Sequence, residues 1–71
     1  MTFAICIDNE GYEAALELRK IYQVVSAEPN DPKDYVRVID ESGEDYLYHK
    51  SAFEVIDLPQ RTERKLIATL R

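Results

Sequence analysis

The clearest hydrophobic pattern in the chain lies in residues 35–56, which predict a β-hairpin that continues into a last strand. β-Branched and aromatic residues dominate 35–39, 45–48 and 53–56, whereas 40–44 is a polar turn that contains Gly43. Such residues favour strands, and glycine supplies the positive φ that a tight turn needs. Residues 49–52 are too few for a full helix and predict a one-turn link. Within the hairpin we expect Val36, Val38 and Leu47 to face inward, with Tyr46 and Tyr48 on the opposite face.

The first half of the chain gives a less uniform pattern. Residues 2–7 predict a strand, and the polar residues 8–11 predict a loop after it. Residues 12–25 are ambiguous: 13–20 are good helix formers, but Leu16 and Leu18 alternate with charged residues, as in a strand. Because 21–25 are β-branched and aromatic, we favour strands, separated by a tight turn at Arg19 and Lys20. Residues 26–34 contain two prolines and predict a long loop.

These elements predict a mainly β fold, with five strands closed into a small, strongly bent barrel over residues 1–58. A short amphipathic helical tail is expected over residues 59–71. The side chains expected inside the barrel are Leu16, Leu18, Tyr22, Val24, Val36, Val38, Leu47 and Val55.

The predicted tail has an apolar stripe with helical spacing. Leu66, Ile67 and Leu70 form the stripe, and Pro59 suits the start of a helix. A helix this short is marginal alone in water, so it needs a surface. Three alternatives remain open: packing on its own barrel, with Arg61, Arg64 and Lys65 against the acidic body, docking on a second copy, or ordering by another protein or a membrane surface.

Composition narrows the class of protein. Seventy-one residues with 45% hydrophobic and 32% charged residues make one small folded domain. Residues 1–58 hold thirteen acids and five bases, whereas 59–71 hold one acid and four bases, so an acidic body carries a basic tail. The net charge of −5 disfavours nonspecific nucleic-acid binding. Cys6, the single cysteine, lies in an apolar run, which predicts a buried thiol in a reducing, cytoplasmic compartment. No apolar run is long enough for a membrane span.

Five tyrosines are the strongest indication of a binding surface, because each offers a large rigid contact with a polar end. The alternative is that they line the barrel rim with their hydroxyls in water. The expected binding residues are Tyr12, Tyr35, Tyr46, Tyr48 and His49. The acids at 40, 41, 44 and 45 lack the alternating spacing of a calcium loop, and we predict neither a metal nor another cofactor. No nucleophile–base motif or phosphate-binding glycine loop is present, so we expect a protein that is not an enzyme.

The order of elements resembles an SH3-like small barrel. The stretch Leu16-Glu17-Leu18-Arg19-Lys20-Ile21-Tyr22-Gln23-Val24-Val25 resembles the early Leu-x-Phe pair, diverging turn and apolar strand of SH3 domains. Residues 45–56 resemble their distal turn, 3₁₀ turn and closing strand. Residues 37–48 also resemble a family of uncharacterised bacterial proteins of about seventy residues. The chain lacks the tryptophan, the tyrosine motif and the link proline of peptide-binding SH3 domains, so proline-peptide binding is not implied.

The function expected from the sequence is therefore a bacterial, non-enzymatic interaction or regulatory module that binds a protein partner, with self-association through the tail as a further expectation. The alternative is a small-barrel nucleic-acid-binding protein that uses exposed tyrosines and the basic tail.

Overall fold

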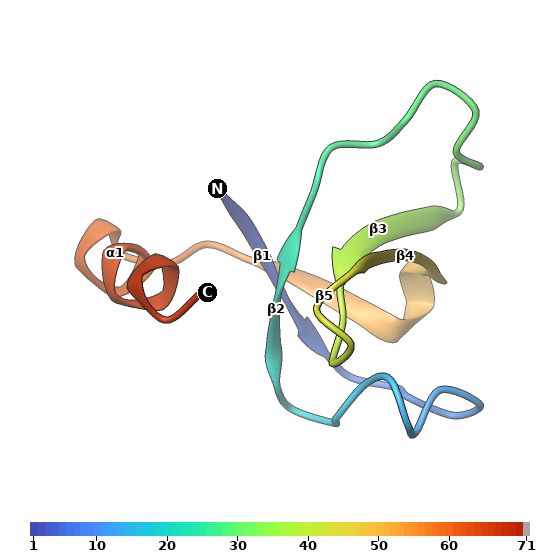
Figure 1. The fold of residues 1–71 in the computed structure, drawn as a ribbon, viewed down its shortest axis with the longest axis horizontal. Coiled ribbons are helices and arrows are strands. Elements are labelled where there is room, and N and C mark those ends of the chain that lie inside the picture. The colour runs from blue at the N-terminus through green and yellow to red at the C-terminus, as the bar shows by residue number, and fades with distance from the viewer. Residues whose placement is uncertain (71) are drawn as a thin grey trace.

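A computed structural model describes residues 1–70 as five β-strands, a single 3₁₀ turn and one helix (Figure 1). The strands are β1 (Thr2–Cys6), β2 (Ile21–Val24), β3 (Tyr35–Ile39), β4 (Asp45–His49) and β5 (Phe53–Ile56). The turn η1 (Lys50–Ala52) links β4 to β5, and α1 (Gln60–Ala68) ends the fold. Five strands and a short C-terminal helix are thus confirmed, as is the one-turn link. No helix within residues 1–70 has the length and apolar character required to cross a membrane.

The strands form a single antiparallel sheet in the order β4-β3-β2-β1-β5. The expected closed barrel is not confirmed, because β4 and β5 are edge strands and the sheet is open. Pairing between β2 and β3 is short, with Val24 opposite Val38 as its one register pair, whereas β1 pairs with each neighbour over four residues. The β3–β4 hairpin therefore diverges from the rest of the sheet.

One face of this sheet carries the main core. Its fully buried side chains include Leu16, Val38 and Tyr48, and Cys6 is buried as predicted. Of the side chains expected inside, Leu16, Tyr22 and Val38 are buried, and Val24 and Val36 pack against them. The remaining three predictions were wrong: Leu18 is 43% exposed, Val55 is 58% exposed, and Leu47 is half-buried outside the core.

The hairpin register explains the error at Leu47. Tyr48 lies opposite Val36, and Tyr46 lies opposite Val38, so both tyrosines share the inward face with these valines. Leu47 lies opposite Arg37 and points to the other face. Tyr48 is therefore a core residue, with only 1% of its surface exposed.

The segment between β1 and β2 is neither strand nor helix, so the strands favoured near Leu16 and Leu18 are absent. The amides of Ala15 and Leu16 both donate to the carbonyl of Tyr12 at 2.9 Å, which closes a turn. The side-chain amide of Asn9 donates to the carbonyl of Leu16 at 2.9 Å. These bonds bury Leu16 and leave Leu18 outside. The expected tight turn is present, because Arg19 adopts φ of 65° just before β2.

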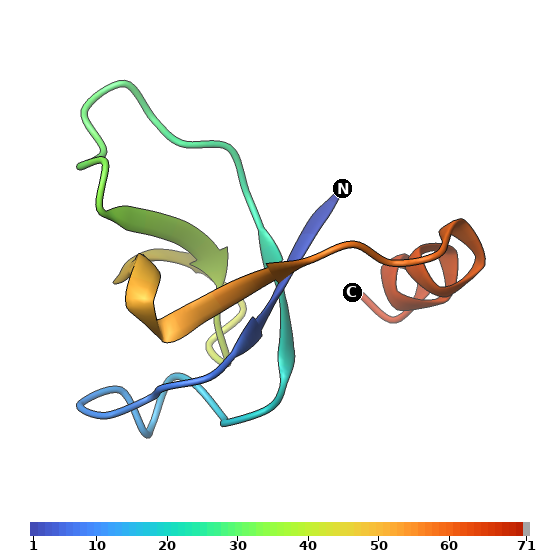
Figure 2. The same cartoon turned by 180° about the vertical axis from the view of Figure 1, so that it is seen from behind.

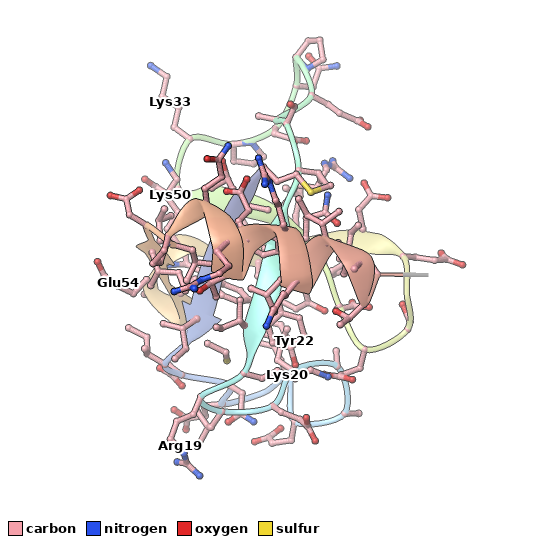
Figure 3. All side chains as sticks on the ribbon, turned by 90° about the vertical axis from the view of Figure 1, so that its left-hand side faces the viewer. Arg19, Lys20, Tyr22, Lys33, Lys50 and Glu54 are labelled. Atoms are coloured by element: carbon pink, nitrogen blue, oxygen red, sulfur yellow. The ribbon has the colours of Figure 1, made fainter. Side chains whose placement is uncertain are left out.

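The helix α1 lies on the opposite side of the sheet. Figures 1 and 2 show α1 on one side of β1 and β2 and the β3–β4 hairpin on the other. Figure 3, viewed from the helix side, shows α1 crossing in front of both strands. Phe3 alternates with the core residues Ala4 and Cys6 and faces this side, yet it is only 3% exposed. Leu70 lies in a shallow hollow with Ile21 and Gln23 of β2.

Leu70 thus lies beside its own sheet, but no residue of α1 is buried and Leu70 itself is 41% exposed, so docking on a second copy or on another protein stays a prediction. The expected ion pairs to the acidic body are absent within the described part of the tail, because Arg61, Arg64 and Lys65 form none there. The ion pair that α1 does form joins Glu63 to the Met1 amino group at 3.8 Å. Arg71, the last residue of the predicted tail, lies outside the described residues.

Arg37 ties the long loop to the hairpin. Its guanidinium donates two bonds to Asp31 in the loop, at 2.7 and 3.0 Å, and one to Asp45 of β4, at 3.0 Å. The side chains of Arg37 and Asp31 are only 16% and 8% exposed. Because the Arg37 guanidinium binds both the Asp31 and the Asp45 carboxylates, it fixes the orientation of the loop after β2 relative to β4.

Candidate functional site

Three tyrosines line a groove between β4 and the segment that follows β1. We call it the tyrosine groove and define it by Tyr12, Ala15, Asp40, Tyr46 and Tyr48; Glu13 also lines it. The open hollow has a volume of about 470 Å³. Tyr46 and Tyr48 reach it because residues two apart on a strand point to the same face. Two elements distant in the sequence thus supply its two walls.

The aromatic rings in the groove hold one another in place. Tyr12 meets Tyr48 edge-on, with ring centroids 4.9 Å apart, and Tyr46 is tilted against Tyr48 at 5.5 Å. Exposure falls steeply across the cluster, from 62% at Tyr46 to 1% at Tyr48. Tyr46 therefore presents a broad aromatic surface to solvent above a rigid base.

Carboxylates set the charge of this groove. The Tyr48 hydroxyl donates to Asp40 Oδ2 at 2.6 Å, and Ser42 donates to Asp40 Oδ1 from its backbone amide and its hydroxyl. Burial raises the pKa of Tyr48, and the bond to Asp40 raises it further. Burial also opposes ionisation of Asp40, but its hydrogen bonds outweigh that effect and lower its pKa. Asp40 is therefore an anion at neutral pH, and no lysine or arginine among the described residues 1–70 lines the groove.

The other two predicted binding residues, Tyr35 and His49, form a separate pair on the opposite face of the hairpin. Their ring centroids are 5.4 Å apart, in an edge-on arrangement. His49 Nδ1 accepts a hydrogen bond from the Ser51 amide at 3.2 Å and so caps η1, which is a structural role. A second hollow of about 400 Å³ lies on this face, lined by Pro32, Tyr35, Arg37, Tyr46 and Leu47.

The structure thus divides the five predicted binding residues into two groups. Tyr12, Tyr46 and Tyr48 converge on the tyrosine groove, whereas Tyr35 and His49 lie on the opposite face of the hairpin, and the exposed ring of Tyr46 borders both hollows. Sequence reasoning missed Glu13, Ala15 and Asp40 as groove residues. The sequence offers no local signal for Glu13 and Ala15, because only the folding of residues 11–15 onto β4 brings them there, and it indicates Asp40 only as one of the acids of the turn.

The acids of the hairpin turn are engaged within the chain. Besides Asp40, Glu41 accepts hydrogen bonds from Lys20 and from the Tyr22 hydroxyl, both at 2.5 Å. The bond from Lys20 is the main cause that lowers the pKa of Glu41, with the Tyr22 bond next. Figure 3 labels Lys20 and Tyr22 close together at this end of β2. Among residues 1–70, no group of three or more histidine, cysteine or acidic side chains is arranged to hold a metal ion.

Comparisons of this chain with protein-family models, with curated proteins and with solved structures give no match.

Proposed function

We propose that this protein is a non-enzymatic interaction module, of SH3-like arrangement and bacterial origin, that binds a segment of a partner protein in the tyrosine groove. The single observation that carries the proposal is the exposed Tyr46 ring above the fixed rings of Tyr12 and Tyr48. A large aromatic side chain that is held ready at the surface loses little conformational entropy on binding.

Two features support the SH3-like part of the proposal. Consecutive strands are neighbours from β1 to β4, and β5 returns to pair with β1. A 3₁₀ turn connects the glycine-containing hairpin to the last strand, which is the order of elements that the resemblance implies.

Substitutions at Tyr46 test the binding proposal. The expected result is that immobilised wild-type protein captures a defined partner from a bacterial lysate, that Tyr46→Ala loses it, and that Tyr46→Phe keeps most of it. Ile7→Ala is the matched control, because Ile7 is similarly exposed, at 55%, but does not line the groove. A stable monomer that captures no protein, and instead shows a thermal shift with a small metabolite, would overturn the proposal.

Nucleic-acid binding is the second candidate, and the basic side chains of α1 favour it. Arg61, Arg64 and Lys65 are exposed and form no ion pair within residues 1–70. However, α1 and the β3–β4 hairpin lie on opposite sides of β1 and β2, so one strand of nucleic acid would have to wrap the domain to use both (Figure 1). A gel-shift at low salt, with and without residues 59–71, separates the two candidates.

A further inference from the structure

The outer edge of β4 has unpaired backbone groups. The amide of Asp40 donates to the carbonyl of Glu44 at 3.1 Å, and hydrogen-bonded pairs then alternate along the hairpin. Tyr46 and Tyr48 accordingly bond to β3, while Asp45, Leu47 and His49 direct their amides and carbonyls away from it.

The contacts of β3 with β2 support the same alternation, in which Tyr46 and Tyr48 bond to β3 and Leu47 does not. The carbonyl of Arg37, the residue opposite Leu47, accepts from the Val25 amide at 2.9 Å and therefore points toward β2. Within residues 1–70, no hydrogen bond of a loop, turn or side chain uses the amides of Asp45, Leu47 or His49.

A hollow lies on each face of this edge. The tyrosine groove is on the face of Tyr46 and Tyr48, and the hollow of Pro32 and Tyr35 is on the face of Leu47. An added strand sends alternate side chains to opposite faces, so it would fill both hollows while its backbone pairs with β4.

We infer that an extended segment of the partner protein adds to the edge of β4 as a sixth strand, with cationic and aromatic side chains in the tyrosine groove. This inference rests on the proposed function and specifies its binding mode. The charge of the groove identifies the segment, because Glu13 and Asp40 line it and, among residues 1–70, no basic residue does. Proline at the paired positions is excluded, because its nitrogen cannot donate to the carbonyls of β4.

A palindromic heptapeptide with blocked ends, Thr-Arg-Val-Tyr-Val-Arg-Thr, is a suitable probe, since it presents the same faces in either strand direction. Its arginines and tyrosine match the tyrosine groove, and its valines match the second hollow. Titration of the labelled protein by NMR is expected to show saturable binding. Amide hydrogen exchange should slow at Asp45, Leu47 and His49, while the amides of Tyr46 and Tyr48, already paired with β3, serve as internal controls.

Backbone methylation of the peptide provides the matched control. N-methyl groups placed on alternate residues block one edge of the peptide, and N-methyl groups on the intervening residues block the other. Only one of the two forms should lose affinity, by about thirtyfold, the effect of losing two backbone hydrogen bonds. The peptide with glutamate in place of both arginines should bind at least about tenfold more weakly.

Two results would overturn strand addition. The first is peptide binding that depends on Tyr46 but leaves exchange at the three edge amides unchanged and tolerates both methylation patterns; the proposed function would survive this result. The second is the absence of binding by the unmodified peptide at millimolar concentration. The proposed function itself fails if the Tyr46 substitutions leave partner capture unchanged, or if the wild-type protein captures no partner and instead shows a thermal shift with a small metabolite.

Discussion

Replacing Tyr48 with phenylalanine removes one buried hydroxyl and leaves the aromatic ring in place. The hydroxyl donates to the Asp40 carboxylate at 2.6 Å, and Tyr48 is only 1% exposed. A hydrogen bond to a charged group contributes about 1.5–3 kcal/mol to the free energy of unfolding. Asp40 is only half-buried and keeps its two bonds from Ser42, which favours the lower end of that range. We expect Tyr48→Phe to lower the free energy of unfolding by about 1.5 kcal/mol at pH 7.

The effect is measurable because a domain of this length has a small total stability. About 0.1 kcal/mol per residue gives a free energy of unfolding of roughly 7 kcal/mol. In a domain of this size, a loss of 1.5 kcal/mol lowers the melting temperature by about 6–12 °C. Urea denaturation at pH 7 measures the free energy directly, and calorimetry gives the melting temperature. Tyr46→Phe is the control: this tyrosine is 62% exposed, so its change should stay within about 0.5 kcal/mol.

The same substitution predicts a pH dependence with a definite sign. The folded-state pKa of Asp40 is lowered from its ordinary value of 3.8, so the stabilisation is present above that value. It disappears as the pH falls through the lower folded-state pKa, because protonation removes the charge. The difference between wild type and Tyr48→Phe should therefore shrink under acid. A Tyr48→Phe effect no larger than that of Tyr46→Phe, or a difference that stays constant as Asp40 is protonated, would show that the bond to Asp40 does not stabilise the fold.

Three further predictions concern other parts of the fold. Phe3→Ala should cost about 3–4 kcal/mol in urea denaturation, whereas Val55→Ala at the exposed edge should cost under about 0.5 kcal/mol; equal losses would contradict the burial of Phe3. Asp31→Asn should accelerate amide exchange in the loop after β2, since it weakens the pairing with Arg37, and unchanged exchange would show that the loop is held by other contacts. Burial raises the pKa of Tyr22 and Tyr48, so stability is retained up to about pH 10 and falls as the pH rises further; ionisation of Tyr22 and Tyr48 near pH 10 without unfolding, followed by ultraviolet absorbance, would oppose this.

The strands were predictable because each combines suitable residue types with a polar boundary. Tyr35–Ile39 and Phe53–Ile56 have the expected bounds, and the glycine turn between β3 and β4 lies where the hairpin needs it. The bounds of the other strands moved by one residue or fewer at each end, as expected when the outermost backbone pairs decide where a strand ends. The sequence also predicted α1 from its apolar stripe.

The inward face of the hairpin was not predictable by alternation alone. Alternation correctly grouped Tyr46 with Tyr48, but both sides of β4 carry apolar surface, so the pattern does not show which side is inside. Which face is buried depends on Asp40. Its carboxylate accepts a hydrogen bond from the Tyr48 hydroxyl and so makes burial of this tyrosine favourable. This contact joins residues on opposite sides of the turn and has no sequence pattern of its own.

The strand predicted in the segment before β2 was wrong for a related reason. Leu16 and Leu18 alternate as in a strand, yet side-chain bonds such as that of Asn9 compete with strand pairing and hold the backbone in successive turns. Two of the residues that line the tyrosine groove, Glu13 and Ala15, lie in this segment, which is why Tyr12 is the one residue of that wall that the sequence predicts.

The positions of the two chain ends have a practical consequence. Met1 pairs with α1, and the end of the described chain follows that helix, so both ends lie on the helix side of the sheet, away from the hairpin (Figure 1). A tether attached at either end, whether a chip linker or a fused domain, would leave the tyrosine groove on the side away from the support. The orientation of the domain on a support is thus the same for both attachment points, and an exchange of tags should leave the measured association rate unaltered.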